Sequence, residues 1–122
     1  MRTGFDFADH HPTTLEQAIK VCINYMSDED FDYVEAHGAT STHHGFGMAM
    51  RNGWGLWQDS PLAQHFKTRF GLGHADDMSG LILEGIDAAV QERSYDPEPT
   101  VARFKAHWQQ MGIDPLTQER VA

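Results

Sequence analysis

The chain has 122 residues, which is the length of one domain. Its 18 Asp and Glu residues outnumber its nine Lys and Arg residues, and the formal net charge of −9 argues against direct binding of nucleic-acid phosphates. A hydrophobic content of 40% is typical of a folded domain, and the single cysteine excludes both an intramolecular disulfide and a cysteine-based zinc site.

The N-terminal residues and the apolar runs predict a cytoplasmic protein. The first residues lack the apolar stretch of a signal peptide, and a run such as Leu81–Leu83 is far too short to cross a bilayer. Cys22 has no disulfide partner and falls within an amphipathic pattern, which fits a reducing compartment. We therefore expect no membrane contact.

The first predicted helix covers about residues 14–26. Apolar residues recur there at helical spacing, which indicates one buried face; they are Leu15, Ala18, Ile19, Cys22, Ile23 and Met26. We expect Thr13 to cap this helix in a capping box with Glu16.

The second predicted helix begins after Ser27 and ends at Gly38. It carries a cluster of five acids: Asp28, Glu29, Asp30, Asp32 and Glu35. Acidic residues are favoured at a helix start and on a solvated face, which explains most of the cluster. A metal site or an acidic surface for a basic partner are the alternative interpretations.

Residues 39–42 are predicted to form a loop, and a third helical pattern follows from Phe46 to Trp57. Several glycines interrupt this pattern, and each weakens a helix by about 1 kcal/mol relative to alanine. We expect either a neighbouring helix to approach closely at Gly53 or the helix to break between Gly53 and Gly55.

Three further helices are predicted in the second half of the chain. Ser60 followed by Pro61 starts the fourth helix, Asp76 or Asp77 caps the fifth, and the sixth covers about residues 101–111.

These patterns predict an all-α fold, a single compact bundle of about five to six short helices. No stretch of useful length alternates with a period of two, so we expect no sheet. Residues 1–11 are expected to form an N-terminal arm, residues 12–112 the helical domain, and residues 113–122 a frayed tail.

Eight histidines are an unusual number for this length, and a transition-metal site is one interpretation of them. No two histidines have the i, i+4 spacing of a helical metal site. We expect exposed or helix-capping histidines and no metal; if a metal is bound, His74, Asp76 and Asp77 are the candidate ligands.

The sequence contains no recognisable catalytic motif. It lacks the nucleophile elbow, the phosphate-binding loop and the dinucleotide fingerprint, and Ser79 is interpreted as a residue of the first helical turn. We predict no catalytic residue and no cofactor. Trp54 and Trp57, at a predicted helix end, are the first candidates for an interaction surface.

Several uncommon groups of residues occur in order along the central chain. They are Pro12-Thr13-Thr14-Leu15, then Arg51-Asn52-Gly53-Trp54-Gly55-Leu56-Trp57, then His74-Ala75-Asp76-Asp77-Met78-Ser79. Together they resemble a family of small bacterial and phage domains with the pattern R-N-x-[WF]-x-L-W followed by H-x-D-D-M-S. The resemblance covers about residues 12–90 and implies a helical fold, but it brings no activity.

We refer to Arg51, Asn52, Asp76, Asp77 and Ser79 as the signature residues, and we expect the two parts of the signature to meet in space. The arginine then pairs with one of the two aspartates, and the asparagine bonds to the backbone of a turn. A structural clasp is our preferred interpretation, and an active site is the alternative.

Three functions from different classes follow from these observations. The first is a non-catalytic, acidic helical module that binds another protein, with a second copy of the chain as one candidate partner. The second is a phage-type accessory inhibitor of a host defence or nucleic-acid enzyme, resembling an anti-CRISPR protein, whose acidic face meets a basic groove. The third is a small metal-dependent hydrolase. We favour the first. Its expected partner is a protein, and basic nucleic-acid-binding proteins are among the candidates.

Overall fold

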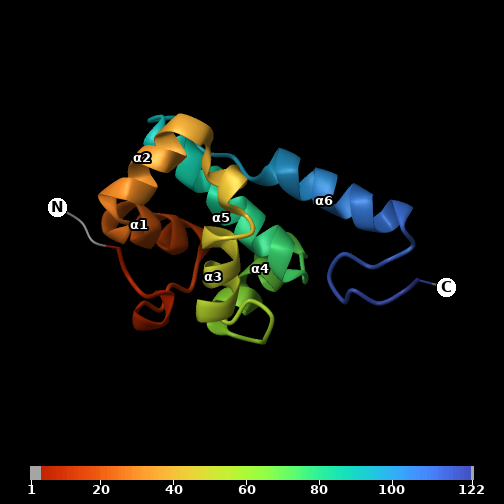
Figure 1. Cartoon of the computed structure of the whole chain (residues 1–122). Coiled ribbons are helices and arrows are strands. Elements are labelled where there is room, and N and C mark those ends of the chain that lie inside the picture. Colours follow the sequence, from red (N-terminus) through yellow and green to blue (C-terminus); the bar gives the residue numbers. More distant parts are fainter. Residues whose placement is uncertain (1–3, 122) are drawn as a thin grey trace.

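The computed structural model describes residues 4–121, and these residues form six α-helices and no strand (Figure 1). The helices are α1 (Leu15–Tyr25), α2 (Asp28–His37), α3 (Phe46–Gly53), α4 (Pro61–Phe70), α5 (Ala75–Val90) and α6 (Glu98–Gln110). Two short 3-10 helices are η1 (Phe7–Asp9) and η2 (Ala39–Thr42). The all-α prediction is confirmed.

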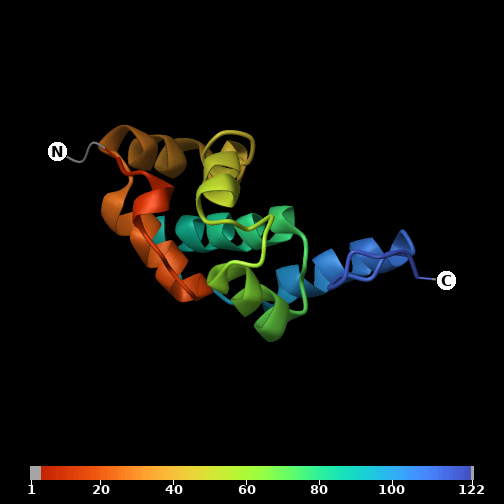
Figure 2. The same ribbon diagram turned by 90° about the horizontal axis from the view of Figure 1, so that it is seen from below.

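Helix α5 is the centre of the fold. Ten of its 16 residues are buried, and α1, α2, α3, α4 and α6 all contact it. Figure 2 shows α6 projecting from the body that the first five helices form. The hydrophobic core therefore surrounds α5, and α6 is an arm that contacts α5 between Asp77 and Glu84. None of the helices within residues 4–121 is long and apolar enough to cross a membrane.

Two of the predicted helix starts agree with the structure. The Ser27 hydroxyl accepts a hydrogen bond from the amide of Asp30 at the start of α2, and the Ser60 hydroxyl accepts one from Ala63 at the start of α4. Gly71 ends α4 in the left-handed conformation, with a φ of 68°. These ends follow from local capping chemistry, which the sequence displays directly.

Two other helix starts were predicted at the wrong residue. Thr14, and not Thr13, caps α1 by accepting from the amide of Gln17. Helix α5 is capped by His74, whose Nδ1 accepts from the amide of Asp76 at 3.0 Å, and not by an aspartate. The aspartates are unavailable as caps because each bonds to a distant residue, as described below.

Helix α3 ends at Gly53, which agrees with the expectation of a break between Gly53 and Gly55. A side chain at Gly53 would collide with Phe7, so the close neighbour there is η1 and not another long helix. The close approach of two helices occurs instead at Gly85 of α5, where a Cβ would collide with Ile19 of α1.

The two ends of the described chain are more ordered than the sequence suggested. The residues of the expected N-terminal arm include Phe7, which is buried against the rings of Phe46 and Trp54. The expected frayed tail folds back on itself through a backbone bridge between Ile113 and Arg120. The contacts of Phe7 join residues 39 and 47 positions apart in sequence, which is why local patterns did not indicate them.

Candidate interaction site

Arg51 of α3 is the most buried charged residue of the described chain, with a side-chain exposure of 4%. Its Nη1 donates to the Ser79 hydroxyl at 2.9 Å and its Nη2 donates to the His43 carbonyl at 3.1 Å. Its Nε is 3.3 Å from Oδ1 of Asp76, which is 45% exposed. One guanidinium thus joins α3, the start of α5 and the segment before α3.

His43 completes the surroundings of this guanidinium. Its Nδ1 is 3.4 Å from Nη1 of Arg51. Burial, followed by the positive charge of Arg51, lowers the pKa of His43 from its ordinary 6.5. The imidazole is therefore neutral at pH 7 and can present a lone pair to the arginine. This arrangement compensates a charge that would be costly to bury alone.

Asp77 lies beside Asp76 but turns to a different partner. Its Oδ2 accepts a hydrogen bond from the indole Nε1 of Trp108 at 2.7 Å, which ties α6 to α5. Burial raises the pKa of this carboxyl, although the bond from Trp108 acts in the opposite direction. The two adjacent aspartates thus hold two different elements, α3 and α6, against α5.

The imidazole of His74 lies between two tryptophans. It stacks on Trp108 with ring centroids 5.3 Å apart and an angle of 27° between planes. It meets Trp57 edge to face at 5.4 Å. Trp57 itself is 56% exposed, because the chain turns at Gly55 (φ 63°) and Leu56 takes the buried position.

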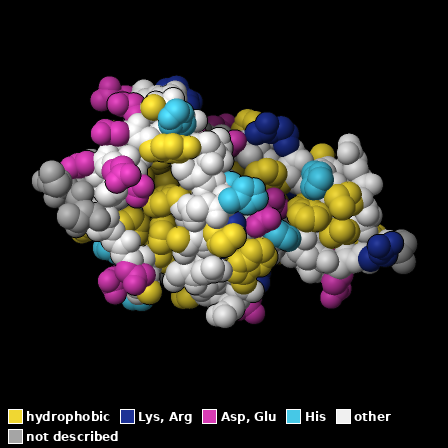
Figure 3. Space-filling model, in the orientation of Figure 1, with side chains coloured by type: hydrophobic (Ala, Val, Ile, Leu, Met, Phe, Trp, Pro, Cys, Tyr) yellow, Lys and Arg dark blue, Asp and Glu magenta, His cyan; other side chains and the backbone are white. Residues whose placement is uncertain are grey.

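These residues form a surface that we call the tryptophan face, defined by Trp57, His74, Asp76 and Trp108. Figure 3 shows hydrophobic side chains, histidines and carboxylates gathered where the α6 arm meets the body of the molecule. Large exposed apolar side chains of this kind, mixed with charge, are typical of interaction sites.

The structure brings three of the five signature residues together, namely Arg51, Asp76 and Ser79. Asp77 is adjacent but bonds to α6, and Asn52 is exposed on α3. Sequence reasoning did not include His43 and Trp108 in the site. His43 contributes mainly a backbone carbonyl, which has no sequence signal, and Trp108 lies beyond the signature.

Of the two tryptophans predicted to interact, only Trp57 offers its ring to a partner at the surface. Trp54 is 6% exposed and packs edge to face on Phe7 at 4.9 Å. Its burial follows from the end of α3, since it is the C-cap residue and still lies on the buried face.

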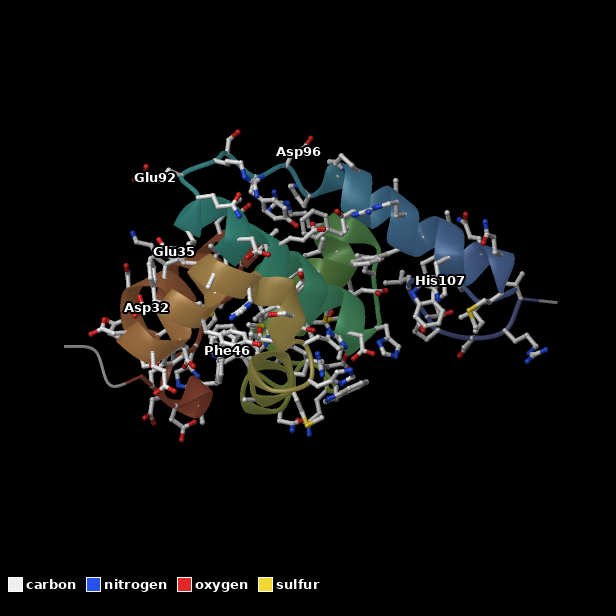
Figure 4. All side chains as sticks on the ribbon, turned by 45° about the horizontal axis from the view of Figure 1, so that its top comes forward. Asp32, Glu35, Phe46, Glu92, Asp96 and His107 are labelled. Atoms are coloured by element: carbon white, nitrogen blue, oxygen red, sulfur yellow. The ribbon has the colours of Figure 1, made fainter. Side chains whose placement is uncertain are left out.

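The acidic residues of α2 lie at the end of the molecule away from α6. Figure 4 shows Asp32 and Glu35 pointing outward there, far from His107 on α6. At about 100° per residue, Asp28, Asp32 and Glu35 line one side of the helix, whereas Glu29 and Asp30 are turned away from it. Asp30 borders a hollow beside Phe46. The acids therefore form a short stripe, not one continuous face.

The candidate metal ligands do not point at a common centre. His74 Nδ1 accepts from a backbone amide, Asp76 pairs with Arg51, and Asp77 accepts from Trp108. In the part of the chain that the structure describes, no group of three or more His, Cys, Asp or Glu side chains is arranged to hold a metal ion.

Comparison with known proteins gives one finding. No curated protein and no solved structure matches the chain. A family model described as a domain of unknown function, DUF6794, matches residues 11–88, which include α1 to most of α5 and all the signature residues. Because this match covers more than half of the chain, the protein belongs to the DUF6794 family.

Proposed function

We propose that this protein is a non-catalytic interaction module that binds a basic surface of another protein through the tryptophan face. The observation that carries the proposal is Trp57, a 56% exposed indole in edge-to-face contact with His74, whose Nδ1 lies 3.9 Å from the carboxylate that pairs with Arg51. Tryptophan and its surroundings often supply most of the affinity of a protein interface.

The charge of the site favours a cationic partner. Arg51 pairs with Asp76, whose side chain is 45% exposed, and Oδ2 of this carboxylate lies 3.9 Å from His74, which also contacts Trp57. A lysine or arginine of a partner can therefore meet an indole and a carboxylate together, a combination that recognises cations. The net charge of −9 would accelerate association with such a partner at low salt.

The hydrogen bonds around Arg51 support a structural role for the signature residues. Its donors are used by Ser79 and by the carbonyl of His43, both of which are fixed parts of the fold. The arginine thus acts as a clasp that fixes the start of α5, where His74 caps the helix and contacts Trp57. A lone, buried Cys22 supports a reducing, cytoplasmic setting for this module.

The proposal is tested by affinity purification from the source cells with the wild-type chain and Trp57→Ala. Tyr33→Ala is the matched control, because Tyr33 is also an exposed aromatic residue but lies on α2. We expect the wild type and the control to retain a basic protein. Trp57→Ala should retain at least about tenfold less of this protein.

Retention of the same partner by Trp57→Ala would contradict the proposal, provided that circular dichroism shows the variant folded. Sedimentation of the purified chain supplies a second measurement. If the wild type is a dimer and Trp57→Ala is a monomer, the tryptophan face binds a second copy of the chain. That result would contradict the proposal of a basic partner.

A second candidate function uses the stripe of acids on α2. Asp32 and Glu35 are exposed on one side of that helix, which supports a phage-type inhibitor that occupies the basic groove of a nucleic-acid enzyme. For this function, binding to the target would weaken steeply with salt and would be lost in the double variant Asp32→Asn, Glu35→Gln, while Trp57→Ala would leave it intact.

A further inference from the structure

Two helices of the fold begin at an imidazole. The amide of Leu15, the first residue of α1, donates to Nε2 of His65 on α4 at 3.0 Å. The amide of Asp76, in the first turn of α5, donates to Nδ1 of His74 at the same distance. A backbone amide can only donate, so the ring nitrogen that faces it carries no proton. Both imidazoles therefore make these bonds only in the neutral form.

The two bonds differ in what they join. His74 directly precedes α5 and bonds to an amide two residues away, so its bond lies within one helix end. His65 and Leu15 are 50 residues apart, so their bond joins α4 to the start of α1. Leu15 is 1% exposed, and an amide in the first turn of a helix has no carbonyl partner within that helix. Loss of the His65 lone pair thus removes the acceptor of a buried amide.

His65 lies between an arginine, a glutamate and two phenylalanine rings. Arg69 is one turn further along α4, Glu16 is the second residue of α1, and Arg69 donates to both carboxylate oxygens of Glu16 at 2.7 Å. The rings of Phe66 and Phe70 meet the imidazole edge to face, with centroids 5.4 and 6.0 Å away. The carboxylate nearest in sequence to the latched amide is therefore already paired with a cation.

These surroundings oppose protonation of His65. Burial, followed by the positive charge of Arg69, lowers the pKa of the imidazole from its ordinary 6.5, although Glu16 acts in the opposite direction. The positive end of the α1 dipole, which Nε2 faces, also disfavours a cation there. Burial acts to raise the pKa of Glu16, but the hydrogen bond from Arg69 brings it below its ordinary 4.5, so this carboxyl is ionised above that pH.

The lowered pKa of His65 has a definite sign. Below pH 6.5 the unfolded chain binds this proton more readily than the folded protein does, so the stability that the bond provides is lost as the pH falls.

We propose that His65 is a pH-sensitive latch between α4 and the start of α1. In the neutral form its Nε2 accepts from the amide of Leu15. In the protonated form the same nitrogen becomes a donor that faces another donor, and the first turn of α1 is released from α4. The latch goes beyond the proposed function and shares no residue with the tryptophan face, so neither proposal depends on the other.

The first test is the position of the ring proton at pH 8. The latch requires His65 to carry its proton on Nδ1, whereas the bond of His74 requires the proton on Nε2. Nuclear magnetic resonance of the ring nitrogens in the ¹⁵N-labelled whole chain distinguishes these two tautomers, and His74 is the internal control. A His65 ring that carries its proton on Nε2 would overturn the inference.

The second test follows the Leu15 amide as the pH is lowered from 8 to 5. We expect His65 to titrate below 6.5 and the Leu15 resonance to move with the same midpoint. Relative to an unstructured peptide at the same pH, the protection of this amide from hydrogen exchange should fall at least about tenfold as His65 is protonated. The amide of Ile82, on the buried centre of α5, should keep its protection.

Constant protection of Leu15 while His65 titrates would contradict the latch. An equal loss at Ile82 would contradict it as well, because the whole fold would then be opening.

His65→Gln keeps an oxygen that can accept from the Leu15 amide and removes the titration. We expect the protection of Leu15 in this variant to be independent of pH over the same range. His37→Gln is the matched control, since His37 is exposed on α2, and it should retain the wild-type response. A response that persists in His65→Gln would assign it to another group. The two wild-type measurements decide the matter even if His65→Gln fails to fold.

Discussion

Arg51 shows how much of the fold can depend on one side chain. Its guanidinium is 4% exposed and holds Ser79, the His43 carbonyl and Asp76 in place. Removal of one partner from a buried pair leaves polar groups without compensation, which costs more than the pair contributes while intact.

We expect Arg51→Met to lower the free energy of unfolding by about 2–3 kcal/mol, a value below that of a fully buried pair because Asp76 is half exposed. Urea denaturation measures the change. Arg103→Met is the control, since Arg103 is 72% exposed in its pair with Glu84, and we expect a loss below about 1 kcal/mol. Equal losses in both variants would show that Arg51 is not a clasp.

Asp77 makes stability depend on pH in an unusual direction. Burial raises the pKa of its carboxyl above the ordinary 3.8, so the folded protein retains this proton where the unfolded chain has lost it. Ionisation of Asp77 therefore lowers the stability as the pH rises from 3.8 through the raised value.

Asp77→Asn removes this titration and keeps an oxygen that can accept from Trp108. We expect the free energy of unfolding of the variant, minus that of the wild type, to increase with pH across that window and then to level off. Chemical denaturation at a series of pH values between 3.5 and 7 provides the data. A difference that stays constant or decreases would contradict the raised pKa.

At the scale of elements, the contact between α1 and α5 depends on a missing side chain. A Cβ at Gly85 would collide with both Cδ1 and Cγ1 of Ile19, and it would also approach Tyr95 at 3.3 Å. The two helices can approach this closely only because glycine occupies the position.

We expect Gly85→Ala to destabilise the protein by about 1 kcal/mol, since overpacking of 1–3 kcal/mol outweighs a gain of about 1 kcal/mol in helix propensity. Thermal or urea unfolding measures the effect. Ile19→Val shortens the side chain that the new methyl meets, so the double variant should recover part of the loss. Stabilisation by Gly85→Ala alone would mean that α1 moves aside without cost.

The helix ends show what the sequence could and could not indicate. Ser27 and Ser60 were identified because each caps its own helix within a few residues. Asp76 and Asp77 were expected to do the same for α5, but Arg51 and Trp108, 25 and 31 residues away in sequence, occupy their carboxylates. Contacts at such distances in sequence leave no local pattern.

The candidate site could be predicted only in part, because some of its contacts also join residues that are far apart in sequence. The meeting of Arg51 with Asp76 and Ser79 could be expected from the signature, because an arginine and adjacent acids form an obvious pair. The contribution of His43 is a backbone carbonyl, and that of Trp108 depends on how α6 folds back along α5. Neither can be deduced from residue type and spacing.

At the scale of the whole molecule, the charge is unevenly distributed. Nine of the 18 acids but only three of the nine bases lie in residues 1–60, and five of those acids are on α2. Asp28, Glu29 and Asp30 lie in the first turn of α2, where the helix dipole favours them, but Asp32 and Glu35 follow that turn. Those two acids therefore contribute mainly repulsion.

We expect the double variant Asp32→Asn, Glu35→Gln to be more stable than the wild type by about 0.5 kcal/mol at low ionic strength. The gain should disappear near 1 M salt, where the screening length falls to about 3 Å. Melting curves at several salt concentrations test this, with Glu119→Gln in the C-terminal segment as a control that changes little. A gain independent of salt would exclude charge repulsion as its cause.

The three tryptophans occupy three different depths, and this gives the protein three optical reporters. Indole fluorescence shifts to longer wavelengths when water reaches the ring, so Trp54, at 6% exposure, should emit in the blue part of the range and Trp57, at 56%, in the red part. Trp108 is stacked on His74 and bonded to Asp77, so its emission should change when α6 separates from α5. Variants that retain one tryptophan at a time would therefore follow the body, the tryptophan face and the α6 arm as separate signals during unfolding.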